Sequence, residues 1–412
     1  MNVLLDLVLR RFIRWGSLQV RYSDGTERRY GAGQPSVGIA LTDPSVEKGL
    51  LLNPGLVFGE AYMDGGIVLT DGTLYDLLDV FMVAAMRGGH PGAALASRLR
   101  EAKRLWTQYN PAPRARRNVA HHYNLNGRLY SLFLDSDRQY SCAYFPRGDE
   151  TLEEAQVLKK RHIASKLKLD RPDLDVLDIG CGWGGMALTL ARDYGARVTG
   201  ITLSTEQLSA ARARARDAGL EDRVRFELMD YRSVATRYDR IVSVGMFEHV
   251  GISHFDRYFR TIRNCLRDDG VALVHSIGRR DGPGATNAWL DKYIFPGGYS
   301  PALSETFAAV ERSGLWVTDC EILRLHYAKT IAHWRSRFAA NRDVIAGLYD
   351  ERFCRMFELY LAGSELAFRR QGHMNFQLQL TRETETVPLS RDYMLEAERE
   401  ATARAQGRIL PG

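Results

Sequence analysis

The sequence contains few cysteines, and their arrangement does not suggest a cross-linked or metal-binding protein. The five are an odd number and widely spaced, with no Cys-x-x-Cys pair and no histidine at metal-ligand spacing. We therefore expect no disulfide framework and no metal site, and a reducing, cytoplasmic environment fits best. Internal repeats and low-complexity tracts are absent from the sequence as well, which is typical of an ordinary globular protein.

Long hydrophobic runs are also missing. The first 15 residues are rich in apolar side chains, but Asp6, Arg10, Arg11 and Arg14 interrupt them. This pattern excludes a secretory signal and is too short for a membrane span. It predicts an amphipathic helix that packs on the protein or lies on a surface.

The excess of one charge sign is small. The 56 Lys and Arg residues exceed the 50 Asp and Glu residues by 6, too few to indicate a nucleic-acid partner, although a pI of about 9.0 leaves anionic partners open. The segment Ser97 to Arg117 carries seven basic residues and one acid, Glu101, and therefore a net charge of +6. It either binds anionic lipid headgroups or forms a solvated helix and linker.

The length of 412 residues and a hydrophobic fraction of 45% predict two or three domains with a large core. Residues 17–31 alternate around a turn and predict a β-hairpin, and residues 74–86 predict a helix. Proline and arginine residues over 110–117 indicate an interdomain connection. We place an N-terminal α/β domain with the basic linker at 1–115, a larger domain at 116–385 and a C-terminal helical tail at 386–412.

The larger domain alternates strand and helix patterns. Strands are expected at Asp175–Gly180, Arg197–Thr202, Val224–Met229, Tyr238–Gly245 and Val271–Ile277, and helices at Gly185–Tyr194, Ser204–Ala218 and Phe255–Leu266. Such alternation is typical of βαβ units, so we predict a doubly wound, Rossmann-like α/β fold. Apolar residues at helical spacing over 328–370 predict helices that close over this sheet.

The first strand of the larger domain runs into a glycine-rich turn, Asp178-Ile-Gly-Cys-Gly-Trp-Gly-Gly185. Glycines at this position let the backbone approach a ligand, but the spacing is not the Gly-x-Gly-x-x-Gly of dinucleotide binding. Asp-x-Gly-x-Gly resembles instead the turn of nucleoside methyltransferases that use S-adenosylmethionine. Asp230 after the third strand would suit the adenine amino group, with Tyr231 beside the ring. The second strand lacks the usual ribose-binding acid, so Thr202 and Gln207 would supply neutral hydrogen bonds.

Several motifs in order carry a narrower resemblance. They are Tyr140-Ser-Cys-Ala-Tyr-Phe145, the turn at Asp178, the segment Asp239 to Gly251, His275-Ser-Ile-Gly278 and the segment His326 to Trp334, with Phe58 to Gly65 in the N-terminal domain. Together they resemble the bacterial cyclopropane-fatty-acyl-phospholipid synthases and are similar to the mycolic acid cyclopropane synthases. Two positions depart from these families. Ser364 stands where many relatives have a cysteine, which excludes a thiol mechanism there, and Arg232 replaces an acid of the mycolate branch.

The resemblance implies a class I methyltransferase fold, two ligands and their binding residues. S-Adenosylmethionine would be bound by Tyr140, Ser141, Gly180, Gly182, Thr202, Leu203, Gln207, Tyr231 and Arg232, to which the strand ends add Asp178 and Asp230. A bicarbonate ion acting as base would be held by Glu248, His275, Tyr327 and the main chains of Cys142 and Ile277. Glu248 and His275 belong to the ends of the fourth and fifth strands, where ligands of such sheets bind, although a helix cap and a structural histidine are simpler roles.

The implied reaction transfers a methylene group to the cis double bond of an unsaturated phospholipid acyl chain. An alkene has no proton to lose beforehand, so methyl transfer leaves a carbocation, and loss of a proton from the new methyl closes a cyclopropane ring. Loss of another proton, or reduction, would give a methyl-branched or other non-ring product. A non-catalytic lipid-binding protein is an alternative of another class. A nucleic-acid methyltransferase is disfavoured, because no Asn/Asp-Pro-Pro-aromatic segment follows the fourth strand.

A lipid substrate implies that the protein reaches a membrane. We expect peripheral association with the anionic inner face of the cytoplasmic membrane, through the basic segment Ser97 to Arg117. The N-terminal domain is expected to dock lipid or to form the contact of a homodimer. The aromatic insertion Asn287 to Tyr299 either lines the acyl entrance or packs as an ordinary loop.

Overall fold

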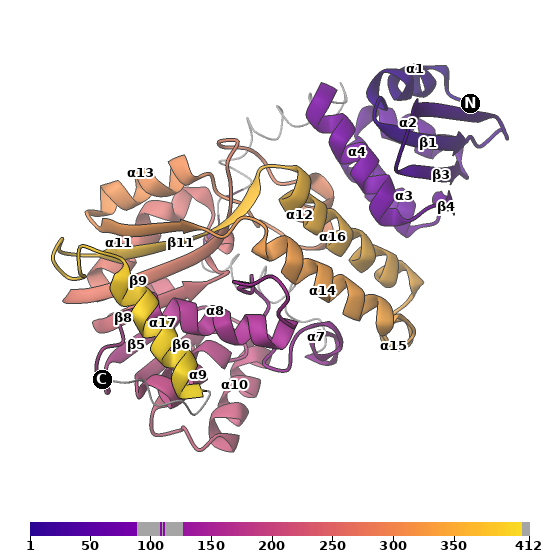
Figure 1. The fold of residues 1–412 in the computed structure, drawn as a ribbon. Helices are drawn as coiled ribbons and strands as arrows, with labels where there is room; N and C mark the ends of the chain where they lie inside the picture. The colour runs from indigo at the N-terminus through magenta and orange to yellow at the C-terminus, as the bar shows by residue number, and fades with distance from the viewer. Residues whose placement is uncertain (89–107, 109, 112–126, 406–412) are drawn as a thin grey trace. The chain divides into compact units, whose positions relative to one another are not determined.

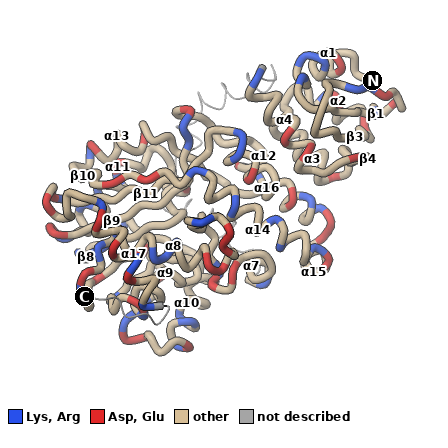
Figure 2. Tube along the Cα trace, viewed as in Figure 1, with Lys and Arg blue, Asp and Glu red and all other residues tan. Residues whose placement is uncertain are grey.

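The computed structural model describes residues 1–88, 108, 110–111 and 127–405. Contacts divide the chain into two compact units (Figure 1): unit 1 comprises residues 1–107, 284–296 and 331–373, and unit 2 comprises residues 108–283, 297–330 and 374–412. Acidic and basic residues are interspersed in both (Figure 2). The domain boundary predicted near residue 115 and the basic residues of the segment Ser97 to Arg117 lie outside the described residues. That boundary therefore stays a prediction.

Unit 1 is built on a four-stranded sheet in the order β2-β1-β3-β4. Its strands are β1 (Gly16–Arg21), β2 (Glu27–Ala32), β3 (Ser36–Leu41) and β4 (Ile67–Asp71). β1 pairs antiparallel with β2, which confirms the predicted hairpin, and parallel with β3. The core forms where α1 (Val3–Phe12), α2 (Pro44–Leu52), α3 (Pro54–Met63) and α4 (Leu74–Gly88) bring apolar side chains against Leu18 and Val20 of β1, both fully buried.

Two later segments complete unit 1. They supply α12 (Ala288–Tyr293), most of α14 (His326–Ala340), α15 (Arg342–Leu348) and α16 (Glu351–Arg370). α16 packs on α3 and α4, and Arg370 pairs there with Asp79 at 2.7 Å. α12 packs on α3 so closely that a Cβ at Gly59 would lie 2.3 Å from the Trp289 ring. The helices predicted over 328–370 are confirmed, and residues 331–370 group with residues 1–88 in unit 1. Their expected closure over the large sheet stays a prediction, because an apolar stripe does not specify its partner.

Unit 2 contains a seven-stranded sheet in the order β10-β11-β9-β8-β5-β6-β7. Its strands are β5 (Asp175–Ile179), β6 (Arg197–Thr202), β7 (Val224–Leu228), β8 (Tyr238–Val244), β9 (Leu266–Arg279), β10 (Trp316–Ile322) and β11 (His373–Thr381). β5 pairs parallel with β6 on one side and with β8 on the other. β6 pairs parallel with β7, and β8 with β9, whereas β10 and β11 pair antiparallel with each other. All five predicted strands are present. From β5 the chain adds β6 and β7 on one side of the sheet and then returns to add β8 and β9 on the other side, so the strand order reverses next to β5.

Helices and short 3-10 turns accompany this sheet. They are α7 (Gly127–Phe133), α8 (Leu152–Lys166), α9 (Gly185–Tyr194), α10 (Thr205–Asp217), η1 (Tyr231–Ser233), η2 (Phe247–His249), η3 (Ile252–His254), α11 (Phe255–Cys265), α13 (Leu303–Ser313) and α17 (Asp392–Ala405). Neighbouring residues of β5 point into different cores: Leu177 packs in one with Phe259 of α11, and Val176 in the other with Leu190 of α9. Both faces of the sheet are therefore covered, which confirms the predicted doubly wound α/β fold.

The structure also bears on the cysteines and on membrane spans. Each of the five cysteines is a free thiol, and only Cys320 is exposed. Among the helices of the described residues, none combines the length and the apolar composition that a membrane span requires.

Candidate functional site

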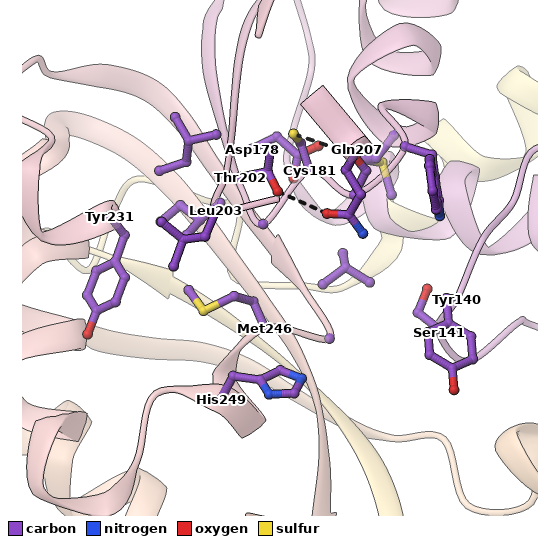
Figure 3. Close-up of a pocket in the computed structure, with 18 of the residues that line it drawn as sticks. Tyr140, Ser141, Asp178, Cys181, Thr202, Leu203, Gln207, Tyr231, Met246 and His249 are labelled. Carbon is purple, nitrogen blue, oxygen red and sulfur yellow. Dashed lines mark hydrogen bonds between the residues drawn. The ribbon is translucent and has the colours of Figure 1, made fainter. Parts of the chain in front are cut away.

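A pocket lies at the carboxyl ends of β5, β6, β7 and β8, next to the point where the strand order reverses. Ligands of doubly wound sheets bind at this edge. The lining includes each of the eleven residues predicted to hold the cofactor, namely Tyr140, Ser141, Asp178, Gly180, Gly182, Thr202, Leu203, Gln207, Asp230, Tyr231 and Arg232. Figure 3 labels several of them around the pocket: Asp178, Thr202, Leu203, Gln207 and Tyr231 from the strand ends and the helix that follows β6, and Tyr140 and Ser141 from another segment. The eleven predicted residues, which the pocket brings together, are up to 92 positions apart in the sequence, from Tyr140 to Arg232.

The turn after β5 depends on its glycines. Gly180 and Gly182 have positive φ angles of 80° and 54°, a conformation that residues with a side chain rarely adopt. A Cβ at Gly180 would also lie 2.9 Å from the Met246 side chain. At Gly182 the space beside the backbone is open. The turn thus exposes main chain to the pocket, as its sequence predicts.

Asp178 places a carboxyl group in the pocket wall just before this turn. The side chain is buried, and its Oδ2 has no hydrogen-bond partner among the described residues. Burial raises the pKa of Asp178 to about 7, although the nearby Lys159 ammonium opposes the shift. A buried acceptor without a partner costs free energy unless a ligand donor reaches it. Asp178 therefore fits a cationic or N–H group of a bound cofactor.

Two neutral side chains stand where the ribose-binding acid is missing. The Thr202 hydroxyl donates to Gln207 Oε1 at 2.9 Å, as the dashed line in Figure 3 shows. Gln207 comes from the first turn of α10, whose N-cap residue Ser204 accepts from the Gln207 N–H at 3.3 Å. Because the amide oxygen faces Thr202, the amide NH₂ group of Gln207 remains to donate to a ligand hydroxyl.

Arg232 gains a role that the sequence did not assign. Its guanidinium pairs with both carboxylate oxygens of Asp230, at 2.8 and 2.7 Å, and donates to the Asn110 carbonyl at 3.1 Å. It also lies 5.3 Å over the Tyr231 ring, which meets Tyr258 edge to face. Asp230 is thus held by Arg232, whose main-chain N–H also donates to Asp230 Oδ1 at 3.0 Å. The Tyr231 ring is fixed from two sides.

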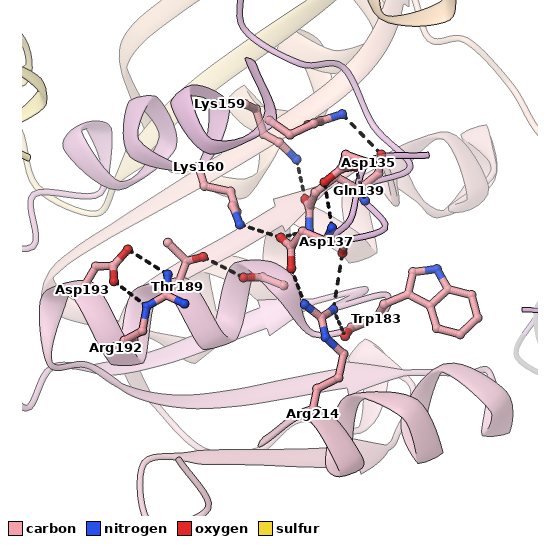
Figure 4. A network of polar contacts seen from close by, with 12 residues as sticks. Asp135, Asp137, Gln139, Lys159, Lys160, Trp183, Thr189, Arg192, Asp193 and Arg214 are labelled. Carbon is pink, nitrogen blue, oxygen red and sulfur yellow. Dashed lines mark hydrogen bonds and ion pairs between the residues drawn. The ribbon is translucent and has the colours of Figure 1, made fainter. Parts of the chain in front are cut away.

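The segment Arg138–Ser141 forms the wall opposite these strand ends and is held by one face of α8. Gln156 donates to the Ser141 carbonyl at 3.0 Å, and Lys159 donates to Ser141 Oγ at 2.9 Å and to Gln139 Oε1 at 2.5 Å. Lys160 pairs with Asp137, which Arg214 of α10 also binds (Figure 4). Gln156, Lys159 and Lys160 are spaced at i, i+3 and i+4 and therefore share a helix face.

Replacement of Lys159 by methionine is expected to weaken cofactor binding. The variant keeps most of the buried volume but removes both donors to the pocket wall, each a charge-assisted bond worth about 1.5–3 kcal/mol. We expect the KM for S-adenosylmethionine to rise about tenfold, the equivalent of about 1.4 kcal/mol, with a smaller change in kcat. Lys160→Met is the matched control, because Lys160 binds Asp137 and no pocket residue. Equal KM values in the two variants would contradict this role.

The residues predicted to hold bicarbonate lie outside the pocket lining, but two of them meet. Glu248 belongs to η2, two residues after the pocket residue Met246, and its Oε1 accepts from the Ile277 N–H at 2.6 Å. Its Oε2 is buried and has no hydrogen-bond partner among the described residues, and the neighbouring Ser276 hydroxyl donates to the Ile277 carbonyl at 2.9 Å. Burial raises the pKa of Glu248 to about 7. Ile277 thus contributes its N–H to Glu248, and the second carboxyl oxygen fits a donor such as the hydroxyl of bicarbonate.

The other three predicted residues, His275, Cys142 and Tyr327, are buried as well. His275 lies two residues before Ile277 on β9, and burial lowers its pKa to about 3, so the ring is neutral. Cys142 follows Ser141; burial raises its thiol pKa, which disfavours a thiolate role. The next N–H, of Ala143, donates to Thr330 Oγ1 at 3.0 Å, which ties this segment to the first turns of α14, where Tyr327 lies.

Comparison with known proteins identifies the family. A family model described as mycolic acid cyclopropane synthetase matches residues 111–378, and a model of a domain of unknown function matches residues 7–86. The chain is 36% identical to the cyclopropane-fatty-acyl-phospholipid synthase of Escherichia coli (strain K12), covering 86% of this chain and 90% of that protein. It is 37% identical to a probable fatty acid methyltransferase of Pseudomonas putida, covering 86% and 89%.

A solved structure agrees with these matches. Mycolic acid cyclopropane synthase CmaA1, complexed with SAH and CTAB, superposes with a TM-score of 0.62 at 31% identity, over 66% of this chain and 99% of that one. These findings confirm the predicted methyltransferase fold and set aside the non-catalytic alternative. The chain therefore belongs to the mycolic acid cyclopropane synthetase family and is an S-adenosylmethionine-dependent methyltransferase.

Proposed function

We propose that this enzyme transfers a methylene group from S-adenosylmethionine to the cis double bond of an unsaturated phospholipid acyl chain and so forms a cyclopropane ring. The observation that carries the proposal is the buried carboxyl of Glu248 beside the cofactor pocket. One of its oxygens is held by the Ile277 N–H, and the other has no partner within the part of the chain that the structure describes. Such a group can hold a small base in place without moving itself. The relative from Escherichia coli has this activity in its name.

The pocket residues support the binding of the whole cofactor, which supplies the electrophilic methyl group when bound. The glycine turn and the Asp178 carboxyl suit the methionine part, and the Thr202–Gln207 pair suits the ribose hydroxyls. Tyr231, held by Arg232, offers a flat surface for the adenine ring beside the acceptors of Asp230. The polar groups are thus distributed as a nucleoside joined to an amino acid requires.

The substrate then needs a base. The electron pair of the alkene forms the bond to the incoming methyl carbon as the carbon–sulfur bond breaks, and the other alkene carbon becomes a cation. Loss of a proton from the added methyl group leaves the electron pair that closes the ring. Bicarbonate would supply this base, with Glu248, His275, Tyr327 and the main chain of Cys142 as the residues that hold it. Glu248 Oε2 would accept its hydroxyl hydrogen, while His275 and Tyr327 would donate.

The product distinguishes this proposal from its closest competitor. Methyl-labelled S-adenosylmethionine and unsaturated phospholipid are expected to give acyl chains that gain CH₂, with cyclopropyl methylene signals in the proton NMR spectrum. A methyl-branched chain formed by reduction would gain CH₄ instead, and a chain that loses another proton would keep an alkene signal. A methylated chain without a ring has support in the Pseudomonas putida relative, a probable fatty acid methyltransferase. Acyl chains that carry the label but give no cyclopropyl signals would therefore show that the product has no ring.

A membrane-bound substrate also calls for a docking surface, and α1 is the described element that fits an anionic bilayer. Val3, Leu4 and Leu7 are 56–64% exposed on it, while Leu5 packs into the core of unit 1. Arg11 and Arg14 continue the exposed side. Apolar side chains that enter the bilayer surface, beside cations that meet headgroup phosphates, are typical of interfacial helices. The homodimer contact stays a prediction.

A double substitution in α1 tests this surface. Leu4→Glu with Leu7→Glu is expected to lower binding to vesicles of phosphatidylglycerol and phosphatidylethanolamine at least about tenfold, since burying one leucine is worth about 1.5–3 kcal/mol. The control is Leu389→Glu, a fully exposed leucine of unit 2. Co-sedimentation measures the binding. Undiminished binding of the α1 variant would remove α1 from the docking surface.

A further inference from the structure

A continuous chain of polar contacts leads from His275 to the C-terminal helix α17. Gln377 of β11 contacts His275 Nδ1 through its Nε2 at 3.1 Å, and its Oε1 accepts from Lys166 Nζ at 2.7 Å. Lys166 of α8 also pairs with Glu321 of β10. Glu321 in turn binds His162 Nε2 at 2.6 Å, and His162 Nδ1 lies 3.2 Å from Glu398 of α17.

The direction of the first two contacts follows from chemistry. A lysine ammonium has only donors, so the Gln377 atom that faces Lys166 must be the amide oxygen. The amide NH₂ then faces His275, and Nδ1 must accept. A neutral imidazole carries one proton, which is therefore on Nε2. Burial lowers the pKa of His275 to about 3, which keeps the ring neutral.

Among the residues that the structure describes, the opposite ring nitrogen makes only a long contact. That contact is with Asn375 Nδ2 at 3.5 Å, which is too long for a strong hydrogen bond in either orientation of the amide. Asn375 Oδ1 is itself buried without a partner among the described residues. The Nε2–H is therefore a donor without a strong acceptor, in the strand that carries the Ile277 N–H two residues later. That position suits donation to an anion beside Glu248.

The remaining contacts explain how the positive charge of Lys166 can be buried. Its side chain is 1% exposed, and a buried ammonium is stable only when it is paired and hydrogen-bonded. Glu321 supplies the charge, Gln377 the second acceptor, and Asp319 lies 3.8 Å away. Glu398 adds α17 to the cluster through His162. The C-terminal helix therefore closes a polar cluster that begins at the reaction centre.

We propose that Gln377, oriented by Lys166, is a positioning residue that holds His275 in the tautomer with its proton on Nε2, so that His275 donates to the base of the reaction. The inference deepens the proposed function and rests on it only for the identity of that acceptor. An imidazole held in the other tautomer would present a lone pair to the anion and repel it.

Gln377→Glu tests the proposal with a side chain of the same shape. The carboxylate can still bind Lys166 but offers His275 an acceptor in place of a donor, so the proton is expected to move to Nδ1. Nitrogen NMR of histidine-labelled protein reads this tautomer, because protonated and bare ring nitrogens have well-separated shifts. His275→Gln identifies the signals among the ten histidines. Gln379→Glu is the control, an acid two residues along β11 where Gln379 contacts Lys166 O and Tyr393.

The expected result is an Nε2-protonated His275 in the native enzyme and an Nδ1-protonated or doubly protonated ring in Gln377→Glu. We expect kcat to fall on the order of 10²-fold with the KM for S-adenosylmethionine nearly unchanged, since Gln377 does not line the cofactor pocket. An Nδ1-protonated ring in the native enzyme overturns the proposal without any variant, even if Gln377→Glu does not fold. A tautomer that switches as expected, in an enzyme that forms no cyclopropane, leaves this inference standing and overturns the proposed function alone.

Discussion

Replacing Glu248 with glutamine is expected to remove nearly all turnover while cofactor binding remains. The glutamine oxygen can still accept from the Ile277 N–H, which the native Oε1 accepts at 2.6 Å. The amide NH₂ then takes the place of Oε2, the buried acceptor for which residues 1–88, 108, 110–111 and 127–405 offer no partner. The amide N–H and the hydroxyl of the base are both hydrogen-bond donors, so they cannot bind each other. We expect kcat to fall by on the order of 10²-fold or more, the usual effect of losing acid–base catalysis.

The measurement needs both a rate and a binding constant. Methyl transfer to phospholipid gives the rate, and calorimetric titration with S-adenosylmethionine gives the affinity, which should not change because Glu248 is not in the pocket lining. Glu150→Gln is a matched control: Glu150 is also buried and accepts main-chain N–H bonds from Arg147 and Gly148 at 2.8 and 2.9 Å. Normal turnover of Glu248→Gln, or equal losses in both variants, would show that Glu248 has only a structural role.

The parts of the site that the sequence predicts are those that local chemistry determines. A strand, a glycine turn and a helix follow one another at Asp178 to Tyr194, and the positive φ angles of Gly180 and Gly182 explain why glycine is needed there. Because parallel strands end at one edge, the strand predictions alone bring Thr202 and Asp230 to that edge. Tyr140, Ser141, Leu203 and Arg232 were expected only from the resemblance to a known family, and they line the same pocket.

What the sequence does not predict depends on contacts between distant segments. Lys159 and Lys166 are not among the site residues that the sequence predicts, yet both are buried, and their partners Ser141 and Gln377 lie 18 and 211 residues away. Gln377 sits in a strand of mixed polarity whose face cannot be assigned without its neighbours. The role of Arg232 becomes clear only from its ion pair with Asp230 in the structure. A helical stripe likewise does not say which unit it will join.

Removal of dissolved carbonate is expected to stop turnover reversibly. The side chains at the reaction centre are poor acceptors for the proton that the substrate must lose. His275 accepts from Gln377 at Nδ1, so its neutral ring carries its proton on the other nitrogen and has no lone pair to offer there. Cys142 is a buried thiol whose raised pKa disfavours the thiolate. Glu248 remains, but its Oε1 is fixed by the Ile277 N–H. A small external base resolves this shortage of acceptors.

Enzyme and substrates equilibrated under CO₂-free gas should therefore lose at least about tenfold in rate, within the range that a general base contributes. Added bicarbonate should restore the rate with saturation, whereas chloride at the same ionic strength should not. The affinity for S-adenosylmethionine should be the same in both conditions, because its pocket is lined by other residues. If turnover persists after exhaustive removal of carbonate, the proton must go to Glu248 itself, whose pKa of about 7 would permit it. In that case Glu248→Gln would be inactive, and bicarbonate would have no effect on the native enzyme. The two experiments together therefore distinguish whether Glu248 holds the base or is itself the base.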